Sequence, residues 1–162
     1  MDNKLLTLEE ALHQRENLRE LGRTLVFTNG CFDLLHPGHL SYLAEAKHLG
    51  NALFVGLNSD SSARGLKGPK RPVNNEKDRA LMLSGLYMVD AVVIFSEDTP
   101  VKLIEALKPD ILVKGGDWAV KDIAGGEFTL SRGGKVLSLP FLPGYSSTAL
   151  INKIAEAYGK VP

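Results

Sequence analysis

Short apolar runs alternate with helix-like segments along the whole chain, and this alternation constrains the fold more than any other feature. The apolar runs predict five strands, at residues 24–28, 52–57, 91–95, 111–114 and 135–139. Helical patterns surround them, at residues 7–21, 37–49, 76–86, 100–107, 127–131 and 147–158. Strands that alternate with helices favour right-handed crossovers and a sheet covered on both faces. We therefore expect an α/β fold, a Rossmann-like three-layer sandwich with a five-stranded, mostly parallel sheet.

The ends of the predicted elements also suggest how the chain is organised. Thr7 and Glu10 form a capping-box pattern at the start of the first helix, and Gly22 is placed to end it. Residues 58–75 are polar and rich in Gly, Pro, Lys and Arg, which predicts a long loop. We expect a single domain over residues 1–162, with an N-terminal helix in 1–22 and an α/β core in 23–162.

The charge balance excludes some classes of partner. The 162 residues include 19 basic and 19 acidic side chains, so the formal net charge is zero. A general nucleic-acid or membrane-surface binder would carry a basic excess, so we expect neither partner. Cys31 is the only cysteine, which fits a reducing compartment. No secretory signal pattern begins the chain and no apolar stretch approaches the roughly 20 residues of a membrane span, so we expect a cytoplasmic location.

The segment after the first predicted strand has the properties of a phosphate site. Pro37 suits the first position of a helix, which makes His36 the N-cap residue. His36 and His39 are three residues apart, so both project on one side of the helix start. Gly38 allows a ligand to approach the backbone closely. Because the N-terminus of a helix offers free N–H groups and a positive dipole end, this segment predicts a binding site for an anion.

Other interpretations of the same segment remain open. Either histidine could be an ordinary cap or a core residue. Cys31, Asp33, His36 and His39 could also be drawn as a zinc-binding set, although no second Cys/His cluster accompanies them. Cys31 could act as a nucleophile only with an oriented base, and the sequence marks none. We therefore favour phosphate binding and expect no protein-bound metal.

The loop after the second strand carries a basic cluster. Arg64, Lys67, Lys70 and Arg71 lie within eight residues, and Arg79 follows early in the next helix. Such a cluster is often only a solvated surface. After a strand of a phosphate-binding sheet, it also predicts a mobile lid whose cations neutralise phosphates.

Two later segments lie where a ligand would contact the same sheet edge. The run Lys114–Trp118 combines two glycines, an acid that could accept hydrogen bonds from a sugar, and a flat aromatic face. A tight turn with an aspartate cap is the alternative. The run Gly144–Thr148 places three hydroxyl residues at a helix start, which predicts both a cap and a second anion site.

The run Gly30–His39, with the sequence GCFDLLHPGH, resembles the signature of the cytidylyltransferase-like nucleotidyltransferases. The resemblance implies that His36 and His39 contact a triphosphate and stabilise transition-state charge, with no covalent enzyme intermediate, and that Lys67 assists them. It implies nucleotide binding by Asn29, Gly30, Cys31, Phe32, Gly38, Tyr145, Ser146, Ser147 and Thr148. It implies substrate binding by Asp33, Arg71, Arg79, Lys114, Gly115, Gly116, Asp117 and Trp118.

Further segments resemble one subgroup of that family, the adenylyltransferases of D-glycero-D-manno-heptose 1-phosphate. These segments are Thr28–Asp33, Leu66–Pro69, Arg71–Asn74, Phe95–Pro100, Leu112–Asp117 and Ala124–Gly126. The resemblance implies ATP and a sugar 1-phosphate as substrates, Mg²⁺ with the ATP, and ADP-heptose for the lipopolysaccharide core as the product. That subgroup occurs fused to a sugar kinase or as a separate chain, and 162 residues leave no room for a kinase domain, so we expect the stand-alone form. The resemblance also implies a dimer or larger homo-oligomer. Two alternatives remain: a cytidylyl- or adenylyltransferase for another acceptor such as glycerol 3-phosphate, and a non-catalytic nucleotide-binding regulator.

Overall fold

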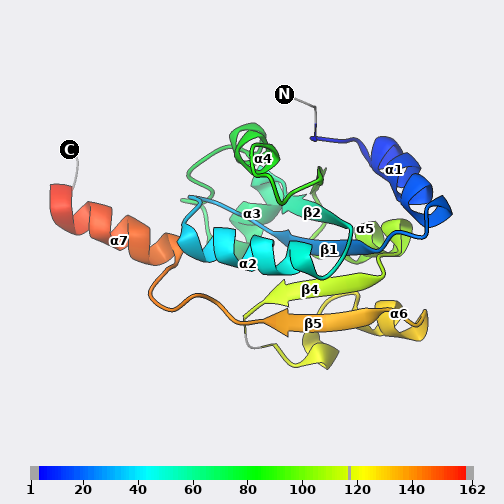
Figure 1. The fold of residues 1–162 in the computed structure, drawn as a ribbon. Helices are drawn as coiled ribbons and strands as arrows, with labels where there is room; N and C mark the ends of the chain where they lie inside the picture. Colours follow the sequence, from blue (N-terminus) through cyan, green and yellow to red (C-terminus); the bar gives the residue numbers. More distant parts are fainter. Residues whose placement is uncertain (1–3, 117, 160–162) are drawn as a thin grey trace.

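A five-stranded parallel sheet forms the centre of the molecule (Figure 1). The computed structural model describes residues 4–116 and 118–159. The strands lie in the order β3-β2-β1-β4-β5. Their bounds are β1 Leu25–Gly30, β2 Ala52–Asn58, β3 Ala91–Phe95, β4 Ile111–Gly115 and β5 Lys135–Leu139. The predicted α/β sandwich is therefore confirmed, and the sheet is parallel throughout rather than mostly parallel.

Helices fill the connections between the strands, and one further helix precedes the first strand and another follows the last. They are α1 Leu8–Glu20, α2 Pro37–His48, α3 Asp60–Lys67, α4 Glu76–Ser84, α5 Val101–Leu107, α6 Gly126–Ser131 and α7 Ser147–Tyr158, with a 3₁₀ turn at Val120–Asp122. The prediction of a continuous loop over residues 58–75 is wrong, because α3 lies inside it. Ser59 caps this helix by accepting a hydrogen bond from the Ser62 amide, and Asp60 stands in its first turn. Among the described residues, no helix is long and apolar enough to cross a membrane.

The strands bury alternate side chains on two faces, as a doubly covered sheet requires. Phe27 and Phe54 point to the face covered by α1, α5 and α6, where Ile104 is fully buried. Val26 and Leu53 point to the opposite face, which α2 and α4 cover. All seven residues of β2 are buried. This burial makes the sheet a rigid platform for the loops at its edges.

The order of the strands determines where a ligand binds. From β1 the chain first adds β2 and β3 on one side, and then crosses back to add β4 and β5 on the other. The loops that leave β1 and β4 therefore diverge at the carboxyl ends of two neighbouring strands. In open α/β sheets, such a switch point forms the ligand crevice.

The capping box predicted at α1 is present and gives a stability prediction. The Thr7 hydroxyl accepts a hydrogen bond from the Glu10 amide at 3.2 Å, and the Glu10 carboxylate accepts one from the Thr7 amide at 2.7 Å. Thr7→Ala removes the first of these, so we expect a loss of about 1 kcal/mol in the free energy of unfolding. Urea denaturation measures it, with Glu16→Gln as a control on the same helix. Equal stability of the Thr7 variant and the wild type would contradict the assignment.

Candidate active site

A pocket of about 440 Å³ opens at the switch point between β1 and β4. Most residues assigned to the site from the sequence line it. Arg79 and Gly116 are not among the lining residues, and Asp117 lies outside the described residues. Tyr42 and Phe141 line it without having been predicted. The lining residues are Asn29, Gly30, Cys31, Phe32, Asp33, His36, Gly38, His39, Tyr42, Lys67, Arg71, Lys114, Gly115, Trp118, Phe141, Tyr145, Ser146, Ser147 and Thr148.

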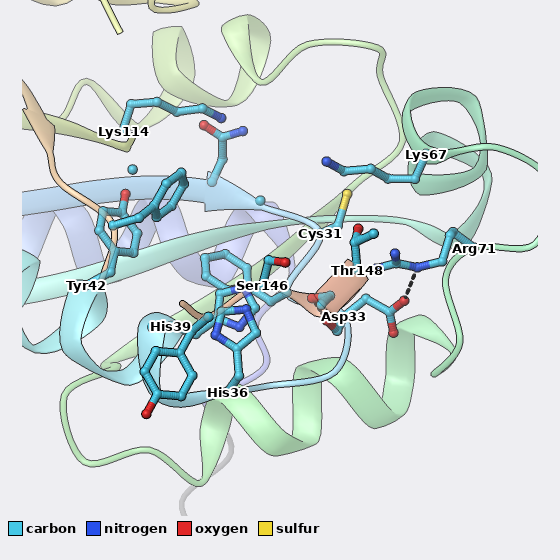
Figure 2. A pocket seen from close by; sticks show the side chains of 18 of the residues that line it. Cys31, Asp33, His36, His39, Tyr42, Lys67, Arg71, Lys114, Ser146 and Thr148 are labelled. Carbon is cyan, nitrogen blue, oxygen red and sulfur yellow. Dashed lines mark hydrogen bonds and ion pairs between the residues drawn. The ribbon is translucent and has the colours of Figure 1, made fainter. Parts of the chain in front are cut away.

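The turn between β1 and α2 has an unusual backbone that its surroundings hold in place. Phe32 and Leu34 have φ values of 45° and 55°, in the left-handed region that non-glycine residues seldom adopt. Between them, Asp33 is buried, and its carboxylate accepts hydrogen bonds from the Val73 and Asn74 amides. A third bond comes from Arg71 Nε at 2.7 Å (Figure 2). Strained backbone conformations persist where several surrounding contacts hold them, as these hydrogen bonds do here.

These hydrogen bonds change the role expected of Asp33. Burial opposes ionisation, but the Val73 and Asn74 amides and the Arg71 guanidinium outweigh it and lower the pKa of the Asp33 carboxyl. Asp33 lines the pocket, as predicted for a substrate-binding residue. Because its carboxylate oxygens are already engaged, it acts here by positioning the turn and Arg71.

Arg79 does not line the pocket, as a substrate-binding residue would. Its side chain is completely buried beneath the turn rather than in the pocket. It donates hydrogen bonds to the carbonyls of Cys31, Asn58 and Asn74, at 2.6, 2.9 and 2.9 Å, and pairs with Asp60 at 2.8 Å. The prediction of a substrate contact is therefore corrected: Arg79 ties the turn after β1 to the end of β2 and to the start of α3.

The two predicted histidines lie together at the start of α2. His36 is the N-cap residue and makes no side-chain cap bond. Its ring stacks on that of His39 with centroids 3.8 Å apart (Figure 2). Both Nδ1 atoms are buried without a hydrogen-bond partner among the described residues. Gly38 makes this arrangement possible, since a Cβ there would stand 3.0 Å from the His36 ring and 3.2 Å from Tyr145 Cβ.

The histidine pair is neutral at physiological pH. Burial lowers the pKa of His36, and burial together with the neighbouring His36 ring lowers the pKa of His39 to about 4. A neutral imidazole has one N–H donor, so each ring can donate to an anion without a large charge being buried beforehand. An arriving phosphate would favour the protonated forms.

This shift predicts a pH dependence of stability. The pKa of His39 is about 4 in the folded protein and about 6.5 in the unfolded chain. Between these two pH values the unfolded state binds more protons than the folded state. The stability that neutral His39 contributes is therefore fully present above about pH 6.5 and is lost as pH falls towards 4. Between pH 7 and pH 5, the free energy of unfolding should therefore fall further in the wild type than in His39→Gln, by about 1–2 kcal/mol. Urea denaturation at both pH values measures this, and parallel losses would contradict it.

Cationic side chains approach the pocket from two sides of the histidines. Lys67 comes from the end of α3 and Lys114 from β4 (Figure 2). Burial is the main cause that lowers the pKa of Lys114, and the charge of Lys67 adds to it. Burial also raises the pKa of the Cys31 thiol despite the nearby cations, so Cys31 is a neutral side chain and a poor nucleophile. Of the predicted basic cluster, Lys67 and Arg71 line the pocket.

The start of α7 closes one side of the pocket with hydroxyl groups. Ser146 is the N-cap and accepts a hydrogen bond from the Ala149 amide at 3.0 Å. The Ser147 hydroxyl donates to the Asp33 carbonyl, which joins this helix to the turn after β1. Thr148 also lines the pocket. The cap predicted from the sequence is thus present, beside a helix N-terminus that faces the pocket.

Aromatic rings also line the pocket, beside the glycine that ends β4. A Cβ on Gly115 would stand 2.7 Å from Phe141 Cε1, so only a glycine lets this ring lie so close. Trp118 Nε1 donates to the Gly115 carbonyl at 3.0 Å. Beneath them, the Tyr42 hydroxyl bonds to Thr28 and donates to the Val113 carbonyl. The only sequence signal for Phe141 was an aromatic residue shortly after the last strand.

A metal centre is not assembled by these residues. Among residues 4–116 and 118–159, no group of three or more His, Cys, Asp or Glu side chains could hold a metal ion. In the set drawn as a zinc site, the Asp33 carboxylate is engaged by Arg71 and two backbone amides. The alternative of a zinc site built from this set is therefore not supported.

In this pocket a helix N-terminus, two imidazoles and several cations converge at the switch point of a parallel sheet. This combination is typical of α/β proteins that bind nucleotides. The sequence profile of the cytidylyltransferase-like family matches residues 27–153. The chain belongs to this family of nucleotidyltransferases.

Two curated relatives are similar to this chain over nearly its whole length. The chain is 48% identical to the bifunctional protein HldE of Citrifermentans bemidjiense, over 97% of the chain and 32% of the relative. It is 52% identical to HldE of Helicobacter pylori strain P12, over 96% of the chain and 32% of the relative. The chain thus spans about a third of the length of these curated relatives.

Solved structures show the same architecture. The lipopolysaccharide core biosynthesis protein of Thermoplasma volcanium is 32% identical with a TM-score of 0.61, over 75% of this chain and 98% of that one. A pantoate-beta-alanine ligase of Francisella tularensis has a TM-score of 0.57 at 16% identity, over 94% and 77% of the two chains. At that identity, the ligase shows only the shared fold.

Proposed function

We propose that this chain is an adenylyltransferase that transfers AMP from ATP to D-glycero-D-manno-heptose 1-phosphate, yielding ADP-heptose for lipopolysaccharide core synthesis and pyrophosphate. The observation that carries the chemistry is the stacked His36–His39 pair at the start of α2, in the same pocket as Lys67 and Lys114. The choice of substrate is supported by about 50% identity to the HldE proteins over nearly the whole chain.

The residues suit a direct displacement. An oxygen of the sugar 1-phosphate attacks the α-phosphorus of ATP, the new P–O bond forms, and the bond to the β-phosphate oxygen breaks with its electrons leaving on pyrophosphate. No side chain becomes covalently attached. His36 and His39 donate hydrogen bonds to phosphate oxygens as charge builds up, and the basic side chains of the pocket neutralise the pyrophosphate. Catalysis of this kind rests on positioning and charge stabilisation.

Magnesium enters this scheme as part of the substrate, in the Mg²⁺ complex of ATP. Of the pocket-lining residues, Asp33 is the carboxylate, and it is engaged by Arg71 and the backbone. The described residues therefore do not fit a resident magnesium site, and the ion is assigned to the phosphates it accompanies.

Isotope transfer tests the reaction itself. With ATP labelled at the α-phosphorus, the label should appear in the nucleotide-sugar, and with the label at the γ-phosphorus it should appear in pyrophosphate. Transfer of the γ-label to the sugar phosphate would indicate a kinase instead. Release of labelled AMP without a sugar product would indicate hydrolysis. Either result would reject the proposal.

Lys67 and Lys70 provide a matched pair for testing the role of the basic segment. Both are exposed, but Lys67 lines the pocket and Lys70 is not among the lining residues. We expect Lys67→Met to lower kcat/KM by roughly 10–100-fold, since a cation near the phosphates is lost. The kcat/KM of Lys70→Met should stay within about twofold of the wild-type value, as expected for a solvated lysine. Equal effects of the two substitutions in steady-state assays would contradict the placement of Lys67.

A further inference from the structure

The pocket has a cationic end and an aromatic end. Figure 2 shows Lys67 and Arg71 on one side of the histidine pair and Tyr42 on the other. Phe141 lies at the Tyr42 end, because a Cβ on Gly115 would stand 2.7 Å from Phe141 Cε1 and 3.3 Å from Tyr42 Cε2. Phosphates belong beside the histidines and the cations, which leaves the aromatic end for a different part of a substrate.

Two rings at the aromatic end are exposed although they lie in a pocket. Phe141 and Trp118 are 59% and 49% exposed, and both line the cavity. A Cβ on Gly116 would stand 2.9 Å from Phe141 Cε2 and 3.2 Å from Trp118 Nε1, so the two rings approach each other over this glycine. Aromatic surface that stays exposed in a cavity is typical of a ligand-binding site.

The polar groups around these rings are already paired within the protein. Trp118 Nε1 donates to the Gly115 carbonyl at 3.0 Å. The Ser138 hydroxyl donates to the Gly116 carbonyl and accepts from the Trp118 amide. The Tyr42 hydroxyl is also engaged. A sugar carries several hydroxyl groups that each need a partner, whereas a nucleotide base presents a flat face that stacks on aromatic rings. These surroundings therefore favour a base over the sugar.

We propose that Phe141 and Trp118 form the subsite for the base of the nucleotide, and that stacking on Phe141 favours a purine. A purine has a larger face than a pyrimidine, so it removes more of the ring surface from water. Lys114 at the same end does not distinguish base from sugar, since its ammonium can donate to a ring nitrogen or to a hydroxyl. The inference rests on the proposed function, and it gives Trp118 to the nucleotide rather than to the acceptor.

Calorimetric titration without an acceptor tests the base subsite. With Mg²⁺ present, Phe141→Ala should weaken ATP binding by roughly 10-fold, within the range expected for the loss of one stacked base. Binding of tripolyphosphate, which has the phosphates but no base, should be unchanged. Phe141→Tyr keeps a flat ring and should bind ATP as the wild type does. Tyr87→Ala is the matched control, since this 80% exposed ring is not among the pocket-lining residues.

Trp118 supplies a second signal, because it is the only tryptophan of the chain. Its fluorescence should be quenched by ATP and not by tripolyphosphate. The wild type should bind ATP more tightly than CTP, and this difference should shrink in Phe141→Ala. Phe141→Leu retains an apolar side chain without the ring, and it should also lose affinity for ATP. It decides the question, together with the fluorescence of the wild type, if the alanine variant proves to be unfolded.

Several results would overturn the proposal. These are unchanged ATP binding by Phe141→Ala, an equal loss of tripolyphosphate binding, a loss of heptose 1-phosphate binding in place of ATP binding, or a wild type that binds no nucleotide. Failure of the proposed function would look different: ATP would bind through Phe141, yet no acceptor would give pyrophosphate. Normal turnover together with unchanged ATP binding by Phe141→Ala would reject the base subsite alone.

Discussion

His39→Ala is expected to lower kcat by roughly 10²–10³-fold, the usual cost of losing one preorganised donor that faces developing charge. The ring is stacked against His36 over the pocket, and its Nδ1 is buried without a partner among the described residues, so it is held ready for an anion. His36→Ala should cause a loss of the same order. Steady-state rates with saturating substrates measure both effects.

A matched control shows whether the loss is specific. His13 lies exposed on α1, away from the pocket-lining residues, and His13→Ala should retain full turnover. Thermal denaturation should show that both pocket variants are folded. Near-normal turnover of folded His36→Ala and His39→Ala proteins would reject the proposed role of the pair.

Arg79→Met is expected to lower the free energy of unfolding by about 3–5 kcal/mol, as for other broken buried ion pairs. The substitution leaves three backbone carbonyls and the Asp60 carboxylate without their donor. These groups belong to segments far apart in the sequence, so the loss should loosen the turn after β1, the end of β2 and the start of α3 together. Urea denaturation measures the change.

Arg19 is a suitable control for the same substitution. Its side chain is exposed and pairs with Glu16 at 3.4 Å on the surface of α1. Arg19→Met should change stability by less than about 0.5 kcal/mol, since surface ion pairs contribute little. If Arg79→Met were no more destabilising than Arg19→Met, the conclusion that Arg79 holds together the turn after β1, the end of β2 and the start of α3 would be wrong.

The strands were predictable from sequence because each is a continuous apolar run in a sheet buried on both faces. The same physics explains why α3 was missed. The sequence of α3 is mostly polar, and its helical start depends on a cap by Ser59 that looks the same as a turn residue in the sequence. Local pattern therefore identified the buried elements better than the partly exposed helix beside the pocket.

The pocket was predictable where its residues are contiguous, as in the run from Gly30 to His39. It was not predictable where long-range packing decides. Phe141 reaches the pocket only because β5 ends beside Gly115, and Tyr42 resembles an ordinary core residue of α2. Arg79 was assigned to substrate binding from the family resemblance, and nothing in the sequence around it indicates that its side chain is buried. Its role follows only from the folded structure, where the carbonyls of Cys31, Asn58 and Asn74 converge on its guanidinium.

The central claim is tested most directly by pyrophosphate release from the purified chain in the presence of Mg²⁺. ATP and CTP would each be supplied with D-glycero-D-manno-heptose 1-phosphate or with glycerol 3-phosphate. The proposed function predicts release only with ATP and the heptose phosphate. Release with a different pair would retain the chemistry and reject the substrate. Absence of release with all four pairs, from folded protein that still binds nucleotide, would contradict the adenylyltransferase assignment and favour a nucleotide-binding regulator.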